Sequence, residues 1–231
     1  MTGASIGMAV LEILIMLVVG VAALFSAANQ KRSRQQRSIE LNDLGRRLGF
    51  DQFRADRDNE FVMGWGFLSP LSKGEDRYAF NILRGIYQGR ALFIFDYHYR
   101  TQQGKESKDI CGTILMLVEK QAFPQLFIQQ ENMRDRIASA LGIGNEVKLE
   151  SAEFSRAFSV RSPDKKFAYD VCNPQMMEYL LANQDLQVEI NGPVISLQFE
   201  PLLPVDQIEL NLQRLTQIRS LMPDYLFAQN A

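Results

Sequence analysis

The hydrophobic residues at the start of the chain predict a membrane-spanning helix. Residues 6–28 read IGMAVLEILIMLVVGVAALFSAA and include one ionisable side chain, Glu12. At a rise of 1.5 Å per residue, a helix of this length crosses a hydrocarbon core of about 30 Å. We therefore expect residues 6–28 to anchor the chain in a membrane, after a short non-cytoplasmic tail of residues 1–5.

The charges around this segment favour one orientation. Lys31, Arg32, Arg34 and Arg37 lie in a basic segment, residues 29–38, whereas the tail contains no basic residue. Basic residues near a span favour the cytoplasmic side, and a cleaved signal peptide needs a basic start and a shorter apolar run. We expect a single-pass anchor with its N-terminus outside and the following domain in the cytoplasm. The four cations are also candidate contacts for anionic lipid headgroups.

Glu12 is a candidate partner contact inside the span. A carboxylate near the middle of a membrane helix costs about 2.5–3.5 kcal/mol on insertion scales. Glu12 therefore either faces a second transmembrane helix, or is protonated or reaches toward the headgroups. With both alternatives open, the predicted partners are the lipid bilayer and, through the span, another membrane protein.

Helical periodicity recurs in the domain that follows. Leu41, Leu44 and Leu48 share one face, which predicts an amphipathic helix over 36–48. Asn173 followed by Pro174 is typical of a helix start. The helices expected after this first one cover 132–142, 173–183 and 205–222.

Strand-like runs occupy most of the remaining domain. β-Branched and aromatic residues flank Gln88–Gly89 and Asn191–Gly192, two dipeptides typical of tight hairpin turns. Further strands are expected over 108–120, 125–130, 146–151 and 154–161. This order of strands and helices predicts an α+β fold with a hairpin-rich, mainly antiparallel sheet packed with helices. Residues 39–231 form either one domain or two lobes, 39–145 and 146–231.

A segment rich in Gly, Pro and Ser separates the first helix from the strands. Residues 61–74, FVMGWGFLSPLSKG, contain Trp65, the only Trp of the chain. We expect a loop folded onto the core. Contact of Trp65 with the membrane interface or with a pocket is the alternative.

Composition argues against several classes of function. The chain has 25 basic and 27 acidic residues. Without Glu12 and the four cations after the span, 21 basic and 26 acidic residues remain, a net charge of −5 for the domain. An acidic domain without a basic stripe is not expected to bind nucleic acid. Cys111 and Cys172 are expected to be buried thiols in the reducing cytoplasm; an opposite orientation would permit a disulfide.

Known catalytic and metal motifs are absent from the sequence. One His and two Cys cannot form a zinc or iron–sulfur cluster. Residues 141–146, LGIGNE, lack the third glycine of a dinucleotide site. Asp56, Asp58 and Glu60 alternate like calcium ligands, but Phe61 takes the place of the required glycine. We expect no cofactor and no metal.

The segment FIFDYHYR contains the one candidate catalytic constellation. In a strand, Asp96, His98 and Arg100 share a face opposite the neighbouring aromatic residues. These side chains are weak candidates for acid–base work or an anion site. We instead expect a solvated strand face with ordinary ion pairs, on which His98→Gln changes stability by no more than about 0.5 kcal/mol.

Two stretches resemble a known family. Residues 81–101 combine Gly85 and Gly89 with the pattern Phe95-Asp96-Tyr97-x-Tyr99, and residues 154–183 contain a Phe-rich run, a short connector and an Asn-Pro helix. Together these stretches resemble uncharacterised bacterial membrane-anchored proteins that are grouped as a domain of unknown function. The resemblance covers roughly residues 79–200. It implies one or two membrane helices and a cytoplasmic α+β domain, and it implies no particular activity.

Three functions follow in order of preference. The first is a membrane-tethered, non-enzymatic binding or assembly protein, as the predicted anchor and the missing catalytic motifs suggest. The second is a domain that binds a small ligand or a lipid headgroup at the membrane surface. The third is an enzyme that uses Asp96 and His98.

Overall fold

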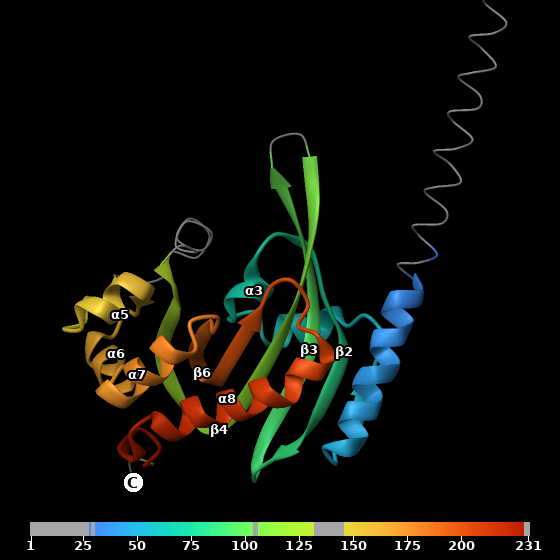
Figure 1. Cartoon of the computed structure of the whole chain (residues 1–231). Coiled ribbons are helices and arrows are strands. Elements are labelled where there is room, and N and C mark those ends of the chain that lie inside the picture. The colour runs from blue at the N-terminus through green and yellow to red at the C-terminus, as the bar shows by residue number, and fades with distance from the viewer. Residues whose placement is uncertain (1–27, 29–30, 104–105, 132–145, 229–231) are drawn as a thin grey trace, which may run out of the picture. The chain divides into compact units, whose positions relative to one another are not determined.

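The computed structural model describes residues 28, 31–103, 106–131 and 146–228, in two units, Met1–Asp43 and Leu44–Ala231. Residues 31–47 are helical, as expected from the leucine spacing. The elements that follow in the second unit (Figure 1) are β1 (Gln52–Arg54), α2 (Asn59–Gly64), α3 (Ser69–Ser72), β2 (Glu75–Tyr87), β3 (Arg90–Gln103), β4 (Glu106–Gln130), α5 (Ala152–Ala157), β5 (Phe158–Arg161), α6 (Lys165–Val171), α7 (Pro174–Ala182), β6 (Val188–Phe199) and α8 (Ile208–Leu221). Short 3₁₀ turns precede and follow α8 at Val205–Gln207 and Asp224–Leu226.

The strands form one sheet in the order β1-β2-β3-β4-β5, with β6 also paired to β4, and all these pairs are antiparallel. The predicted hairpin between β2 and β3 is confirmed. Its turn residues Gln88 and Gly89 have positive φ angles of 49° and 78°, the conformation that a two-residue hairpin turn requires. The α+β class with a mainly antiparallel sheet is therefore confirmed for the described residues.

β4 is the central strand, and both of its halves pair with β6. Residues 113–118 pair with 194–199 of β6, whereas residues 126–128 pair with 188–190. β6 folds back on itself between these halves, because Ser196 Oγ donates to the Glu189 carbonyl (3.0 Å) and Gln198 N–H donates to the Gln187 carbonyl (3.1 Å). The predicted turn at Asn191–Gly192 is thus confirmed. The two separate strands predicted over 108–130 are one continuous strand.

One face of the sheet packs beneath α2 and α3. Phe95 of β3 with Ile114 and Met116 of β4 are fully buried there against Leu68 and Leu71. Phe61 and Trp65 are partly buried on the same core, so the expected packing of residues 61–74 onto the core is confirmed, although this segment forms two short helices. Leu115, Leu117, Ile195 and Leu197 point to the opposite face and are also fully buried.

α8 lies across β4 and β6 (Figure 1). Its buried residues repeat every three or four positions, as the sequence predicts for the helix over 205–222. They are Ile208, Asn211, Leu212, Leu215 and Ile218. Because strands from both halves of residues 44–231 share one sheet, these residues form a single unit.

In the second half, the predicted strand over 146–151 is wrong, and the strand predicted over 154–161 is confirmed only for residues 158–161, which form β5. Residues 146–151 contribute only a bridge from Glu146 to Arg161. Residues 152–157 form α5 because Ser151 caps the helix, accepting a hydrogen bond from the Phe154 N–H. Phe154 then stacks on Phe158 with ring centroids 5.0 Å apart, so an aromatic run that reads as a strand is divided between a helix and β5.

Several predictions concern residues outside the described part of the chain. They are the span over 6–28 with Glu12, of which only residue 28 is described, the tail 1–5 and the helix over 132–142. Among the described helices, none is long and apolar enough to cross a membrane. Lys31, Arg32 and Arg34 are exposed on the described helix over 31–47.

Candidate functional site

β3 brings the predicted candidates Asp96, His98 and Arg100 to the face opposite Phe95 and Tyr97, as strand alternation requires. The expectation of a solvated face is wrong for two of the three. Asp96 is 1% exposed and His98 is 5% exposed, whereas Arg100 is exposed. Residues from neighbouring strands cover this face and supply hydrogen-bond partners that the spacing within β3 cannot show.

The Asp96 carboxylate belongs to a separate buried network. It accepts hydrogen bonds from Asn81 Nδ2 (2.9 Å) and Thr113 Oγ1 (2.8 Å). Thr113 Oγ1 in turn accepts the N–H of Leu203 at 3.1 Å, which holds the chain after β6 against β4. Asn81 has a φ of 51° at a register shift of β2, a conformation that Asn tolerates better than most residues. The structure therefore does not bring Asp96 and His98 together as an acid–base pair.

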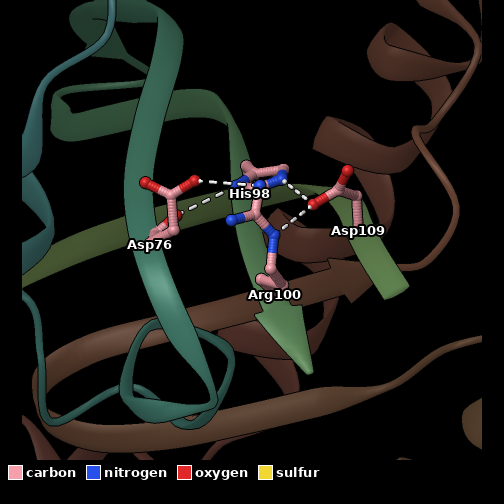
Figure 2. Close-up of polar contacts among 4 residues, drawn as sticks. All are labelled: Asp76, His98, Arg100 and Asp109. Atoms are coloured by element: carbon pink, nitrogen blue, oxygen red, sulfur yellow. Dashed lines mark hydrogen bonds and ion pairs between the residues drawn. The ribbon is translucent and has the colours of Figure 1, made fainter. Parts of the chain in front are cut away.

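His98 instead lies between Asp76 and Asp109 (Figure 2). Its Nδ1 is 3.0 Å from the Asp76 carbonyl oxygen, and its Nε2 is 3.2 Å from Asp109 Oδ1. Both partners are acceptors, so which ring nitrogen donates depends on the tautomer of the ring. Asp76 has a φ of 51° next to a bulge in β2, which directs its carbonyl toward the ring.

Arg100 closes this cluster at the exposed edge. Its Nε donates to Asp109 Oδ1 at 3.0 Å, and its Nη2 lies 3.4 Å from Asp76 Oδ2 (Figure 2). The hydrogen bond from Arg100, and then that from His98, lower the pKa of Asp109 below its ordinary value. The same contact with Asp109 raises the pKa of Arg100. Asp76, His98, Arg100 and Asp109 are hereafter the His98 cluster.

The ring of His98 is also packed between strands. It stacks on Tyr78 with ring centroids 4.5 Å apart and planes 20° apart. The Arg57 guanidinium lies 4.2 Å from the centroid of the Tyr78 ring. Because each ring nitrogen lies against a protein oxygen and the ring face is covered, His98 presents no open nitrogen to a substrate. This geometry joins β2, β3 and β4, and it suits a structural clamp better than a proton-transfer site.

The described residues contain no group of three or more His, Cys, Asp or Glu side chains arranged to hold a metal ion. In the same described part of the chain, Cys111 and Cys172 are not disulfide-bonded. Cys172 is buried, and burial raises the pKa of its thiol to about 12, which keeps it protonated and unreactive.

Glu189 is a buried carboxylate that the sequence reasoning missed. The N–H of Ser69, at the start of α3, donates to both of its carboxylate oxygens at 3.0 and 3.1 Å, and Gln198 Nε2 also donates to it. Burial raises the pKa of Glu189 to about 7, against the opposing effect of these hydrogen bonds. No sequence signal marked it, because Val-Glu-Ile reads as a strand with an outward-facing acid.

A pocket of about 250 Å³ opens near the end of β6. Leu186, Phe199 and Leu203 supply apolar side chains, and Gln198 connects the pocket with Glu189. The acidic side chains at the pocket are Asp185, which pairs with Arg214 at 2.7 Å, and Glu200, which accepts a hydrogen bond from the Tyr99 hydroxyl at 3.3 Å. This lining favours an uncharged or cationic group over an anion.

No protein-family model and no curated protein matches the chain. Its mixed α+β architecture is similar to that of a solved structure, the crystal structure of the mycobacterial trehalose monomycolate transport factor A, TtfA. The TM-score is 0.60 and the sequence identity 14%, over 80% of this chain and 96% of that chain. At this identity the likeness shows a shared fold.

Proposed function

We propose that this chain is a membrane-tethered, non-enzymatic binding or assembly protein whose domain lies on the cytoplasmic side. The observation that carries the proposal is the combination of a 23-residue apolar segment, residues 6–28, with the fold of a transport factor. An anchored domain is confined to the membrane surface, where it meets membrane proteins at high effective concentration. Recruiting such a partner needs a specific surface and no reactive group.

The His98 cluster supports a binding role over an enzymatic one. Its four residues satisfy one another, and Asp96 is engaged elsewhere by Asn81 and Thr113. A general base needs a free nitrogen or oxygen within hydrogen-bond reach of its substrate. In this geometry the His98 cluster stabilises the pairing of β2, β3 and β4.

Co-purification in mild detergent tests the proposal. A tag after Ala231 on the full chain should recover a membrane protein in stoichiometric amount. Repeated recovery of the chain alone would count against a binding role. As a matched control, a chain in which residues 1–30 are replaced by an unrelated span keeps the domain at the membrane. Loss of the partner from that control assigns the contact to the native span, with Glu12→Gln as the single-residue version.

The pocket beside β6 favours a second candidate, a small-ligand-binding domain. Its apolar floor and its amides suit an uncharged ligand, and Asp185 and Glu200 disfavour an anionic headgroup. A thermal-shift comparison of neutral and anionic lipid headgroups and metabolites tests this candidate. Stabilisation by a neutral ligand that Phe199→Ala abolishes would support it, and stabilisation by none would contradict it.

A further inference from the structure

Large apolar side chains gather at the end of α2, where Met63 and Phe67 are exposed and Trp65 and Phe93 are half-buried. The Trp65 ring lies 5.9 Å from Phe67 and 5.7 Å from Phe93, between ring centroids. Phe67 is 40% exposed, and Met63, two residues before Trp65, is 75% exposed. Met63, Trp65, Phe67 and Phe93 are hereafter the apolar patch.

β2 extends this surface and adds a positive charge. Arg84 and Ile86 lie opposite Phe93 and Ala91 in the register of β2 and β3, so both share the face of Phe93. Ile86 is 64% exposed, and the Arg84 guanidinium lies 5.4 Å from the centroid of the Phe93 ring. The border of the apolar patch at β2 is therefore apolar and cationic. Glu60 is the acidic residue in the first turn of α2.

The core beneath α2 does not depend on the exposed side chains of Met63 and Phe67. Val62 and Leu68 already supply the buried contacts of this segment, at 3% and 0% exposure. A Cβ on Gly64 would meet no atom within 4 Å, so packing does not demand a glycine there. The glycine leaves the space beside Trp65 free of a side chain. Contiguous exposed apolar residues of this kind mark interaction sites.

We propose that the apolar patch docks on the lipid surface of the membrane to which the chain is anchored. This inference rests on the proposed function, since the anchor holds the domain at that surface. Only residues 29–51 separate the predicted span from β1. Trp and Phe side chains bind at the boundary between headgroups and acyl chains, and Arg84 is placed to pair with an anionic headgroup.

Trp65 is the only Trp of the chain, so it is a native probe of this contact. The full chain is reconstituted in liposomes of phosphatidylcholine and phosphatidylglycerol, with and without brominated acyl chains on the phosphatidylcholine. We expect the brominated lipid to quench most of the Trp65 emission, and the emission maximum to lie at shorter wavelength than in the unfolded chain. Met63→Gln with Phe67→Gln should restore much of the emission.

A matched control moves the probe to another exposed aromatic position. Tyr169 of α6 is 49% exposed, so the double variant Trp65→Phe, Tyr169→Trp reports from a different surface of the same domain. Its emission should be quenched much less. Equal quenching at both positions would contradict docking through the apolar patch.

The remaining outcomes distinguish docking of the apolar patch on lipid from anchoring of the chain in the membrane. Co-flotation with liposomes but no quenching of Trp65 overturns docking while leaving the anchor in place. Iodide, a quencher dissolved in the water, then distinguishes two cases. It quenches the Trp65 emission if the apolar patch faces water, and it does not if a second protein copy covers the patch. Either result overturns the lipid contact. Failure of the chain to co-float overturns both.

Discussion

The side chain of His98 shows how much a single polar residue depends on partners distant in the sequence. Its acceptors are Asp76 and Asp109, 22 and 11 residues away. Strand alternation correctly placed Asp96, His98 and Arg100 on one face, but it contains no information on what covers that face. Glu189 is a second example, because the donors at its carboxylate come from α3 and from the opposite half of β6.

Replacement of His98 should destabilise the domain measurably. His98→Gln removes the polar contacts of the ring with Asp76 and Asp109 and the stacking contact with Tyr78, so we expect a loss of roughly 1–3 kcal/mol in the free energy of unfolding. This replaces the much smaller loss expected for a solvated face. Urea unfolding of the full chain in mild detergent, followed by Trp65 emission, measures it. The exposed Lys108→Gln on β4 is the control; an equally small change in both variants would contradict the buried geometry.

Glu189 should make stability fall as pH rises. Its pKa is raised to about 7 in the folded chain from an ordinary 4.5, so the folded state holds the proton more tightly than the unfolded state. The stabilisation is complete below pH 4.5 and is lost as the pH rises to about 7. The expected total is about 3 kcal/mol at most.

Glu189→Gln cannot ionise and supplies the comparison. The difference in unfolding free energy between the original chain and this variant, measured from about pH 4 to about pH 8, should follow that loss. A pH-independent difference would show that the Glu189 carboxylate is not desolvated in solution.

Among the structural elements, those with local sequence signals were predicted well. The Gln88–Gly89 turn, the α7 start at Asn173 and the spacing of apolar residues in α8 are each encoded within a few positions. Elements decided by distant contacts were not predicted. Two strands were expected over 108–130, but β4 is one strand because its two ends pair with the two halves of β6. α6 was missed because its seven residues are too few to show a helical period.

The contribution of the α7 N-cap to stability can be tested by replacing Asn173. The Asn173 side chain accepts the Met176 N–H at 3.0 Å, and its Nδ2 donates to the Leu221 carbonyl at 2.8 Å, at the end of α8. Asn173→Ala should cost about 1 kcal/mol for the cap alone, and more because the link to α8 is also lost. Asn173→Asp keeps the cap but not the donor, so its loss in thermal or urea unfolding should be smaller. Equal losses would show that the cap contributes nothing, and an unchanged stability of Asn173→Asp would show that the Leu221 contact contributes nothing.

The molecule as a whole combines a domain whose architecture is shared with a transport factor and an N-terminal segment whose composition predicts a span. The order of strand, hairpin and helix patterns was sufficient for the α+β class, because these signals are local. The pocket and the apolar patch could not be predicted as surfaces. Each depends on which side chains the completed sheet leaves uncovered.

The basic segment after the span should control orientation. Replacing Lys31, Arg32, Arg34 and Arg37 by Gln removes the main charge asymmetry across the span, so the fraction of chains with a cytoplasmic C-terminus should fall. A reporter fused after Ala231, active on one side of the membrane only, measures that fraction. The same number of Lys and Arg replacements within 148–165 is the control, and it should leave the orientation unchanged.

In the proposed topology, residues 6–28 hold the domain at the cytoplasmic face of a membrane. Protease treatment of intact spheroplasts that express the full chain tests this topology. We expect that the domain sediments with membranes, resists the protease while the spheroplasts are intact, and is digested once they are lysed. Digestion in intact spheroplasts, or recovery of the full chain in the supernatant after lysis, would contradict it.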